Sequence, residues 1–187
     1  MKKTKKNFTL VELLCAVGLV VILAGIGFSA YSYASYRGKE AATKSLITRL
    51  GAGLETLKTK HGFYPASTSY GNIQVNINAT GLIDSITFGS AQAVTDTKQL
   101  KDFLSVVDGE SLKKYVSVPS GTGTVTDAWG GNIKYCYPGA VNTVKFDIVA
   151  PGADEGFGTG SVGTPPSALG NYKTNGEWAC DDIANFK

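Results

Sequence analysis

The sequence is poor in the side chains that carry most enzyme chemistry. It has one histidine, His61, and three cysteines, and it contains no nucleophile elbow, no Ser/His/Asp set and no cluster with metal-ligand spacing. Histidine is the most frequent general base, and a single copy without a partner nearby in the sequence supports no catalytic site. We therefore predict that the protein is not an enzyme and that His61 is an ordinary residue at the end of a helix.

The chain also has little net charge. The formal net charge is +3, but the first seven residues contain four lysines, so the rest of the chain has a formal charge of −1. The basic balance thus comes from a short leader, not from a broad surface. We therefore do not expect nucleic-acid binding through a basic face.

One long hydrophobic run covers Phe8 to Ala30, and Glu12 is its only charged residue. From Leu13 no further charge occurs before Arg37, which meets the length of about 18–20 residues that a helix needs to cross a bilayer. A secretory signal would have a shorter apolar core that ends in a small-x-small cleavage site and contains no acid, whereas this run contains Glu12. Because positive charge before a first span keeps that end in the cytoplasm, we expect a single-pass protein with an exported C-terminal part.

Glu12 needs an explanation of its own. An ionised carboxylate inside the hydrocarbon layer costs at least about 2.5 kcal/mol, so its position favours a partner in an assembled state. The alternative is an acid near the start of an ordinary anchor that reaches the membrane interface.

The basic leader, the segment Phe-Thr-Leu-Val-Glu-Leu at residues 8–13 and the apolar run together resemble the processing and assembly signal of type IV prepilins and of type II secretion pseudopilins. The resemblance implies that a prepilin peptidase cuts between Asn7 and Phe8 and that the new amino group of Phe8 is methylated. It also implies that Glu12 pairs with the first amino group of a neighbouring subunit. The family prefers glycine before the cut, where this chain has Asn7.

A second helical pattern continues the first. Between residues 31 and 60 the apolar side chains recur at steps of three and four residues and form one stripe, namely Ala42, Leu46, Leu50, Leu54 and Leu57. The pattern ends at His61-Gly62, a typical helix stop. We predict one helix from Phe8 to about Lys60, with a transmembrane first half and an amphipathic second half.

Shorter elements are expected after this helix. The patterns predict a loop with a small β-ribbon at residues 66–94 and a helix at 96–107. A turn at 111–118 and a flexible connector at 120–123 should follow. Two strands are expected at 133–137 and 144–149. The second strand should be half-buried, with Val144, Phe146 and Ile148 on one face and Lys145, Asp147 and Val149 on the other. The expected fold is α+β, with the long helix packed on a small antiparallel sheet.

The expected organisation has three parts. A leader (1–7) precedes an assembly helix (8–36) and a soluble domain (37–187). The soluble domain divides into an amphipathic helix, a variable region and a C-terminal sheet and loop, at residues 37–60, 61–126 and 127–187.

The C-terminal third strengthens the resemblance. Asp-Ala-Trp-Gly at 127–130, Phe-Asp-Ile at 146–148, Gly-Ala-Asp at 152–154 and the closing Asp-Ile-Ala-Asn-Phe at 182–186 resemble the major pseudopilin of type II secretion. This implies a type IV pilin-like fold and a calcium ion in the loop before the tail. Asp154 matches the first acidic ligand, and the next aspartates, after an insertion, are Asp181 and Asp182. The alternative is a solvated glycine-rich loop without metal.

Cys136 and Cys180 lie in the part that is predicted to be exported, and an oxidising compartment would permit a disulfide between them. Since a disulfide requires Cα atoms within about 7 Å of one another, the sequence leaves the pairing open.

The predicted function is a structural subunit that polymerises through its N-terminal helix into a type II secretion pseudopilus. The alternatives are a type IV pilus pilin in adhesion, motility or DNA uptake, a membrane-tethered enzyme, and an anchored ligand-binding domain that uses Tyr70, Tyr172 and Trp178. The implied partners are further copies of the chain, other pseudopilins, the prepilin peptidase, the inner-membrane assembly platform and the membrane. The soluble domain would be periplasmic, and calcium would be the only cofactor.

Overall fold

The computed structural model describes residues 9–91, 93–158, 165–167, 169–174, 177–178 and 180–186. The chain divides into two compact units, residues 1–38 and 39–187. Helix α1, Leu10–His61, contributes residues to both units.

Helix α1 agrees closely with the predicted helix. Its C-terminal end carries Lys58 and Lys60, whose positive charges interact favourably with the negative end of the helix dipole, and it closes with His61. Gly62 follows with φ 82°, a left-handed conformation, and its N–H donates to Lys58 O at 3.0 Å. The glycine stop in the sequence therefore ends the helix as expected.

The second half of α1 buries the predicted leucine stripe. Leu46 is 1% exposed, and Leu50, Leu54 and Leu57 are fully buried in the core of the second unit. By contrast, every described residue of α1 in the first unit is exposed.

The main sheet has six strands, and every strand pair in it is antiparallel. The strand order is β2-β1-β4-β5-β8, and β3 pairs with β1. A second, two-stranded sheet pairs β6 with β7. The strands are β1 Ser67–Ile77, β2 Ile83–Phe88, β3 Gly121–Thr124, β4 Lys134–Tyr137, β5 Asp147–Ala150, β6 Lys173–Thr174, β7 Glu177–Trp178 and β8 Ile183–Ala184.

Strand β1 is the centre of the main sheet because it pairs with β2, β3 and β4. Ile73, Val75 and Ile77 alternate along it and are all buried, as the period of two in the sequence predicts. Val75 faces Ile86 of β2 and Gly123 of β3 in the two registers.

Two short helices follow the hairpin, α2 Thr97–Val107 and α3 Gly109–Lys113. Asp96 caps α2, since its Oδ1 accepts the N–H groups of Lys98 and Gln99 at 2.9 Å. The predicted helix over 96–107 is confirmed, and its Leu100, Phe103 and Val107 are buried. Two 3-10 turns, η1 Gly152–Asp154 and η2 Leu169–Tyr172, complete the described elements.

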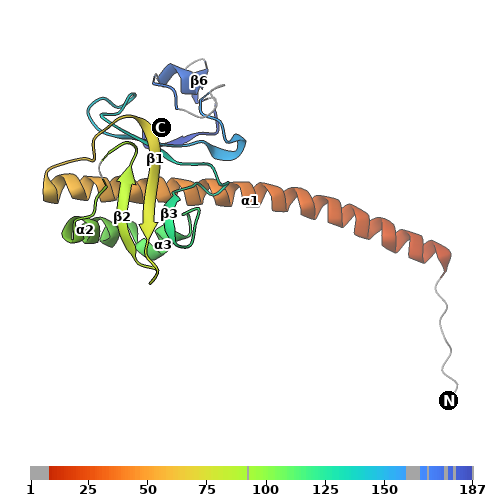
Figure 1. Cartoon of the computed structure of the whole chain (residues 1–187). Helices are drawn as coiled ribbons and strands as arrows, with labels where there is room; N and C mark the ends of the chain where they lie inside the picture. The colour runs from red at the N-terminus through yellow and green to blue at the C-terminus, as the bar shows by residue number, and fades with distance from the viewer. Residues whose placement is uncertain are drawn as a thin grey trace. The chain divides into compact units, whose positions relative to one another are not determined.

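Helix α2 packs closely against the second half of α1. A Cβ at Gly53 would lie 2.6 Å from the Phe103 ring and 2.7 Å from Val107, so only glycine allows this approach. At the end of α1, Lys60 Nζ and His61 Nε2 lie 2.7 and 3.0 Å from the Asp102 carboxylate of α2. In Figure 1, β1 and β2 cross this half of α1 and α2 runs beside it.

The structure corrects three local predictions. The expected connector at 120–123 contributes to β3, because Gly123 packs so tightly on Val116 and Val118 that a Cβ would lie 2.6–2.7 Å from them. The expected turn at 111–118 begins inside α3. The strand expected over 144–149 starts only at Asp147, and Val144 is 82% exposed in the preceding turn.

The coarse fold prediction is confirmed. The structure is α+β, with a long N-terminal helix on a small antiparallel sheet.

Replacing Leu50 with alanine tests the leucine stripe. Leu50 is fully buried, so Leu50→Ala should lower the free energy of unfolding by about 2–5 kcal/mol through lost burial and a residual cavity. Urea unfolding of the detergent-solubilised chain, followed by tryptophan fluorescence, measures this. The matched control is Leu82→Ala, whose side chain is 61% exposed and whose effect should stay within about 0.5 kcal/mol. Equal effects of the two variants would contradict the assignment.

Candidate functional site

Glu12 lies in the first turn of α1, where it interacts with Thr9. The Thr9 N–H and hydroxyl both donate to Glu12 Oε2 at 2.9 Å, and the Glu12 N–H donates to Thr9 Oγ1 at 3.3 Å. This reciprocal arrangement is a capping box, which satisfies backbone donors at a helix start. Glu12 therefore has a structural role within its own chain that the sequence argument did not include. Asn7 and Phe8, the predicted processing residues, lie outside the described residues.

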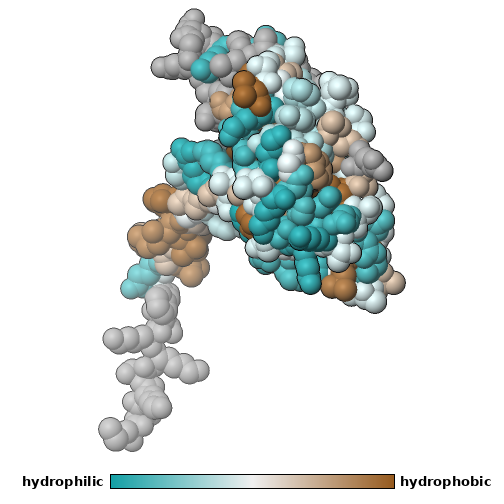
Figure 2. All heavy atoms as spheres, turned by 90° about the vertical axis from the view of Figure 1, so that its left-hand side faces the viewer, coloured by the Kyte–Doolittle hydropathy of each residue, from teal (hydrophilic) through white to brown (hydrophobic). Residues whose placement is uncertain are grey.

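The helix surface that follows Glu12 is apolar on every side. Large hydrophobic residues from Leu13 to Phe28 are at least 55% exposed, and Gly18, Gly25 and Gly27 have no neighbouring atom within 4 Å of a Cβ position. Figure 2 shows a cluster of hydrophobic residues on this helix. By length and composition, α1 is the one helix among the described residues that is suited to cross a membrane.

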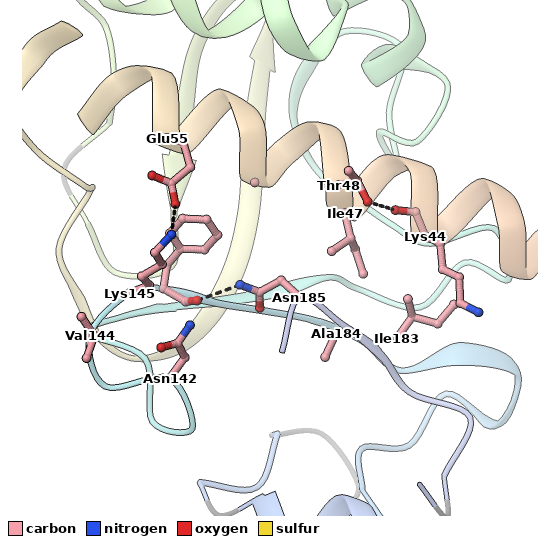
Figure 3. Close-up of a pocket in the computed structure, with 12 residues that line it drawn as sticks. Lys44, Ile47, Thr48, Glu55, Asn142, Val144, Lys145, Ile183, Ala184 and Asn185 are labelled. Carbon is pink, nitrogen blue, oxygen red and sulfur yellow. Dashed lines mark hydrogen bonds and ion pairs between the residues drawn. The ribbon is translucent and has the colours of Figure 1, made fainter. Parts of the chain in front are cut away.

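The second unit contains a groove of about 910 Å³. Its walls come from residues 44–55 of α1, the turn at 142–146 and the tail at 183–185. Figure 3 shows Lys145 reaching from the turn to Glu55 on α1, and their charged groups lie 2.9 Å apart. The groove thus has a mixed polar and apolar lining, and it contains an ion pair that joins the turn to the helix.

Asp147 holds the turn that forms one wall of the groove. Its carboxylate is fully buried and accepts hydrogen bonds from Tyr70 Oη at 2.8 Å, Val141 N at 2.7 Å and Asn142 N at 3.0 Å. The close approach needs Gly139, where a Cβ would lie 2.5 Å from Asp147 Oδ1. The prediction that Asp147 lies on the outer face of a half-buried strand is wrong, because β5 is buried throughout.

Asn185 attaches the tail to the sheet beside the groove. Its Oδ1 accepts the N–H of Ile148 at 2.7 Å, and its Nδ2 donates to Phe146 O at 2.9 Å (Figure 3). The side chain therefore continues the ladder between β8 and β5 where the backbone pairing ends. This gives the asparagine of the closing motif a structural role.

Asp127 organises the Asp-Ala-Trp-Gly turn. Its buried carboxylate accepts the N–H groups of Trp129, Gly131 and Gly152 at 2.8–3.1 Å. Burial raises the pKa of this carboxyl, and the backbone donors oppose the rise. The N–H of Ala128 donates to Thr43 Oγ1 of α1 at 3.2 Å, so the turn is also fastened to the helix.

The three acids proposed as calcium ligands have backbone partners in the structure. Asp181 Oδ2 accepts the N–H groups of Ala153 and Asp154, and Asp182 Oδ2 accepts the N–H of Gly158. Burial, with smaller contributions from Asp181 and Asp154, raises the pKa of Asp182 to about 6. Within the described ranges, no three His, Cys, Asp or Glu side chains are arranged to hold a metal. Calcium binding therefore stays a prediction.

The structure has no disulfide between Cys136 and Cys180. Cys136 Sγ donates to the carbonyls of Ser67 and Pro138 at 3.3 and 3.2 Å, while Cys180 Sγ lies 3.6 Å from Tyr172 O. Each thiol therefore has its own backbone acceptor. The pairing that the sequence left open is not formed.

The three aromatic residues considered for ligand binding do not form one exposed surface. Tyr172 is fully buried and Tyr70 is half-buried with its hydroxyl on Asp147. The side chain of Trp178 lies outside the described residues.

His61, which had no partner nearby in the sequence, contacts Asp102, which is 41 residues away along the chain.

No protein-family model and no solved structure matches the chain.

Replacing Asp147 with asparagine tests the buried clamp. Asparagine presents an amide N–H₂ where three donors now meet a carboxylate, so a buried donor loses its acceptor. We expect Asp147→Asn to lower the free energy of unfolding by about 1–3 kcal/mol. The matched control is Asp84→Asn, because Asp84 is exposed and accepts one side-chain bond from Asn78. Similar urea-unfolding curves for the two variants would refute the clamp.

Calcium binding has a direct test in thermal unfolding. A bound ion would raise Tm in CaCl₂ relative to EDTA, and Asp154→Asn or Asp181→Asn would reduce the increase. The increase should be present above a pH of about 6 and lost below it, because the Asp182 carboxyl, with its pKa near 6, must be ionised to accept a cation. Magnesium is the control, since it prefers a smaller octahedral site. Equal Tm values in CaCl₂ and EDTA at pH 7.5 would exclude the ion.

Proposed function

We propose that the protein is a pilin-like structural subunit, which is held in a membrane by α1 and then polymerises through this helix into a filament. The observation that carries the proposal is the contrast within α1. Residues 10–38 are exposed around the whole helix, while the leucines after residue 45 are buried in a folded unit.

An apolar helix that is exposed on all sides must be shielded from water. Removing each large aliphatic side chain from water stabilises it by about 1.5–3 kcal/mol. A bilayer supplies this cover before assembly, and the helices of neighbouring subunits supply it in a filament core. The same surface thus supports both stages.

The resemblance at residues 8–13 narrows the proposal to a pseudopilus of type II secretion. In this proposal the prepilin peptidase cuts before Phe8, the N-terminus faces the cytoplasm, and the second unit faces the periplasm on the inner membrane. Further copies of the chain, other pseudopilins and the inner-membrane assembly platform are its partners. The hydrogen bonds of Asp127, Asn185 and Asp147 support the narrower proposal, because they give structural roles to three segments that carry the C-terminal resemblance.

The proposed partner of Glu12 is the amino group of the first residue in a neighbouring subunit. Pairing would neutralise two charges that are each unfavourable in hydrocarbon. Since Glu12 also completes the capping box with Thr9, substitution with alanine would remove both roles together. Glutamine separates them, because it retains the capping hydrogen bonds but carries no charge.

The assembly role of Glu12 predicts that Glu12→Gln inserts into the membrane and retains the start of α1 but forms few or no filaments. Filament yield in the native host, measured by shearing and immunoblotting beside the membrane-bound pool, checks this. Thr9→Val is the matched control, because it removes the capping hydroxyl and leaves the carboxylate. Normal filament yield with Glu12→Gln would assign Glu12 to capping alone.

The intact mass of the membrane-extracted protein shows whether it begins at N-methylated Phe8.

A further inference from the structure

The apolar part of α1 ends in a segment of unusual composition. Residues 29–36 read Ser-Ala-Tyr-Ser-Tyr-Ala-Ser-Tyr, and Arg37 follows. Tyr31, Tyr33 and Tyr36 are 72%, 64% and 39% exposed. Tyrosine combines an apolar ring with a hydroxyl that requires a polar partner, so it is suited to a boundary between apolar and aqueous surroundings.

The tyrosines point in different directions around α1. With 3.6 residues per turn, Tyr31 and Tyr33 lie about 160° apart, and Tyr36 lies about 140° from Tyr31. A single docked protein would contact one face of the helix, whereas a lipid layer surrounds it. The angular spread therefore favours lipid as the partner of these side chains.

Their position along the axis fits a bilayer. Leu10–Phe28 spans about 28 Å at 1.5 Å per residue, close to the hydrocarbon thickness of about 30 Å. From Tyr31 to Tyr36 the helix rises about 7.5 Å. This matches one polar interface, since head groups bring the bilayer to about 40–45 Å.

The other polar groups of the segment also suit this boundary. The hydroxyls of Ser29 and Ser32 donate to Gly25 O and Phe28 O of their own helix, at 3.3 and 3.1 Å. These donors are therefore satisfied without water at the edge of the hydrocarbon. Arg37 Nε donates to Tyr33 Oη at 3.2 Å, and the guanidinium carbon lies 5.4 Å from the centroid of that ring. A cation is thus held beside the tyrosines, where lipid phosphates would lie.

We propose that Tyr31, Tyr33, Tyr36 and Arg37 form a tyrosine anchor that lies in the phospholipid headgroup layer and fixes the depth of α1 in the bilayer. The anchor rests on the proposed membrane span and specifies its outer boundary. Tyrosine and tryptophan concentrate at this depth because their rings prefer the headgroup region to both hydrocarbon and water. The anchor would hold the apolar segment in place before assembly.

Spin labels on the full chain measure the depth directly. The three native cysteines are replaced by serine, a single cysteine is placed at Ser32 or at Leu19, and the protein is reconstituted in vesicles of phosphatidylcholine and phosphatidylglycerol. Relaxation by oxygen and by a water-soluble nickel chelate gives the depth of each label. The Leu19 label should lie in the hydrocarbon and the Ser32 label in the headgroup layer.

Variants of the anchor test whether it sets this depth. Tyr→Ala at all three positions should displace the Ser32 label by about 3 Å or more, equal to two residues of helix rise. Tyr→Trp at the same positions should preserve the depth, since tryptophan also prefers the interface. The matched control replaces the exposed residues Val17, Val21 and Ile26 with alanine, which should leave the label in place.

Several outcomes would overturn the anchor. They are a Ser32 label at the depth of the Leu19 label, a Ser32 label in bulk water, and an unchanged depth after Tyr→Ala. A Leu19 label in water would reject the membrane span itself, and with it the membrane stage of the proposed function. A Leu19 label in hydrocarbon with a Ser32 label in water rejects the anchor alone.

Discussion

Burial of the leucine stripe on α1 is the interaction on which the second unit depends. Leu46, Leu50, Leu54 and Leu57 share one core with side chains of the sheet and of α2. Burying each leucine stabilises the fold by about 1.5–3 kcal/mol, and no other described element contributes as many fully buried side chains from a single face. The sheet is small, and its outer strand β8 has only two residues. The strands therefore need the helix to complete their core.

Buried carboxylates organise the loops that the core does not reach. Asp127 and Asp147 are both at most 3% exposed, and each accepts three hydrogen bonds. Most of these donors are backbone N–H groups of tight turns, which would be unsatisfied inside the protein without them. The two acids thus allow glycine-containing turns to lie against the sheet. Asp147 also holds the turn that lines the groove between α1 and the tail.

The first part of α1 has the opposite requirement. Its described apolar side chains are not buried within the first unit. The helix therefore forms its own backbone hydrogen bonds, but its apolar side chains stay exposed to solvent. A capping box at Thr9 and Glu12 begins the helix, and tyrosines with Arg37 mark the place where the apolar surface ends. Both ends of the apolar stretch therefore carry polar contacts of their own. This is consistent with a helix that moves as a unit between a bilayer and a filament core.

Local patterns in the sequence determined the long helix, its leucine stripe, the helix at 96–107 and the alternation in β1. Each of these follows from a period or a stop signal within a few residues, so no distant partner is needed to predict it. Tertiary structure decided the rest. The burial of Asp147 depends on Tyr70, which is 77 residues away, and the partner of His61 is 41 residues away. Strand β3 exists because β1 offers an edge to glycines that have no strand preference of their own.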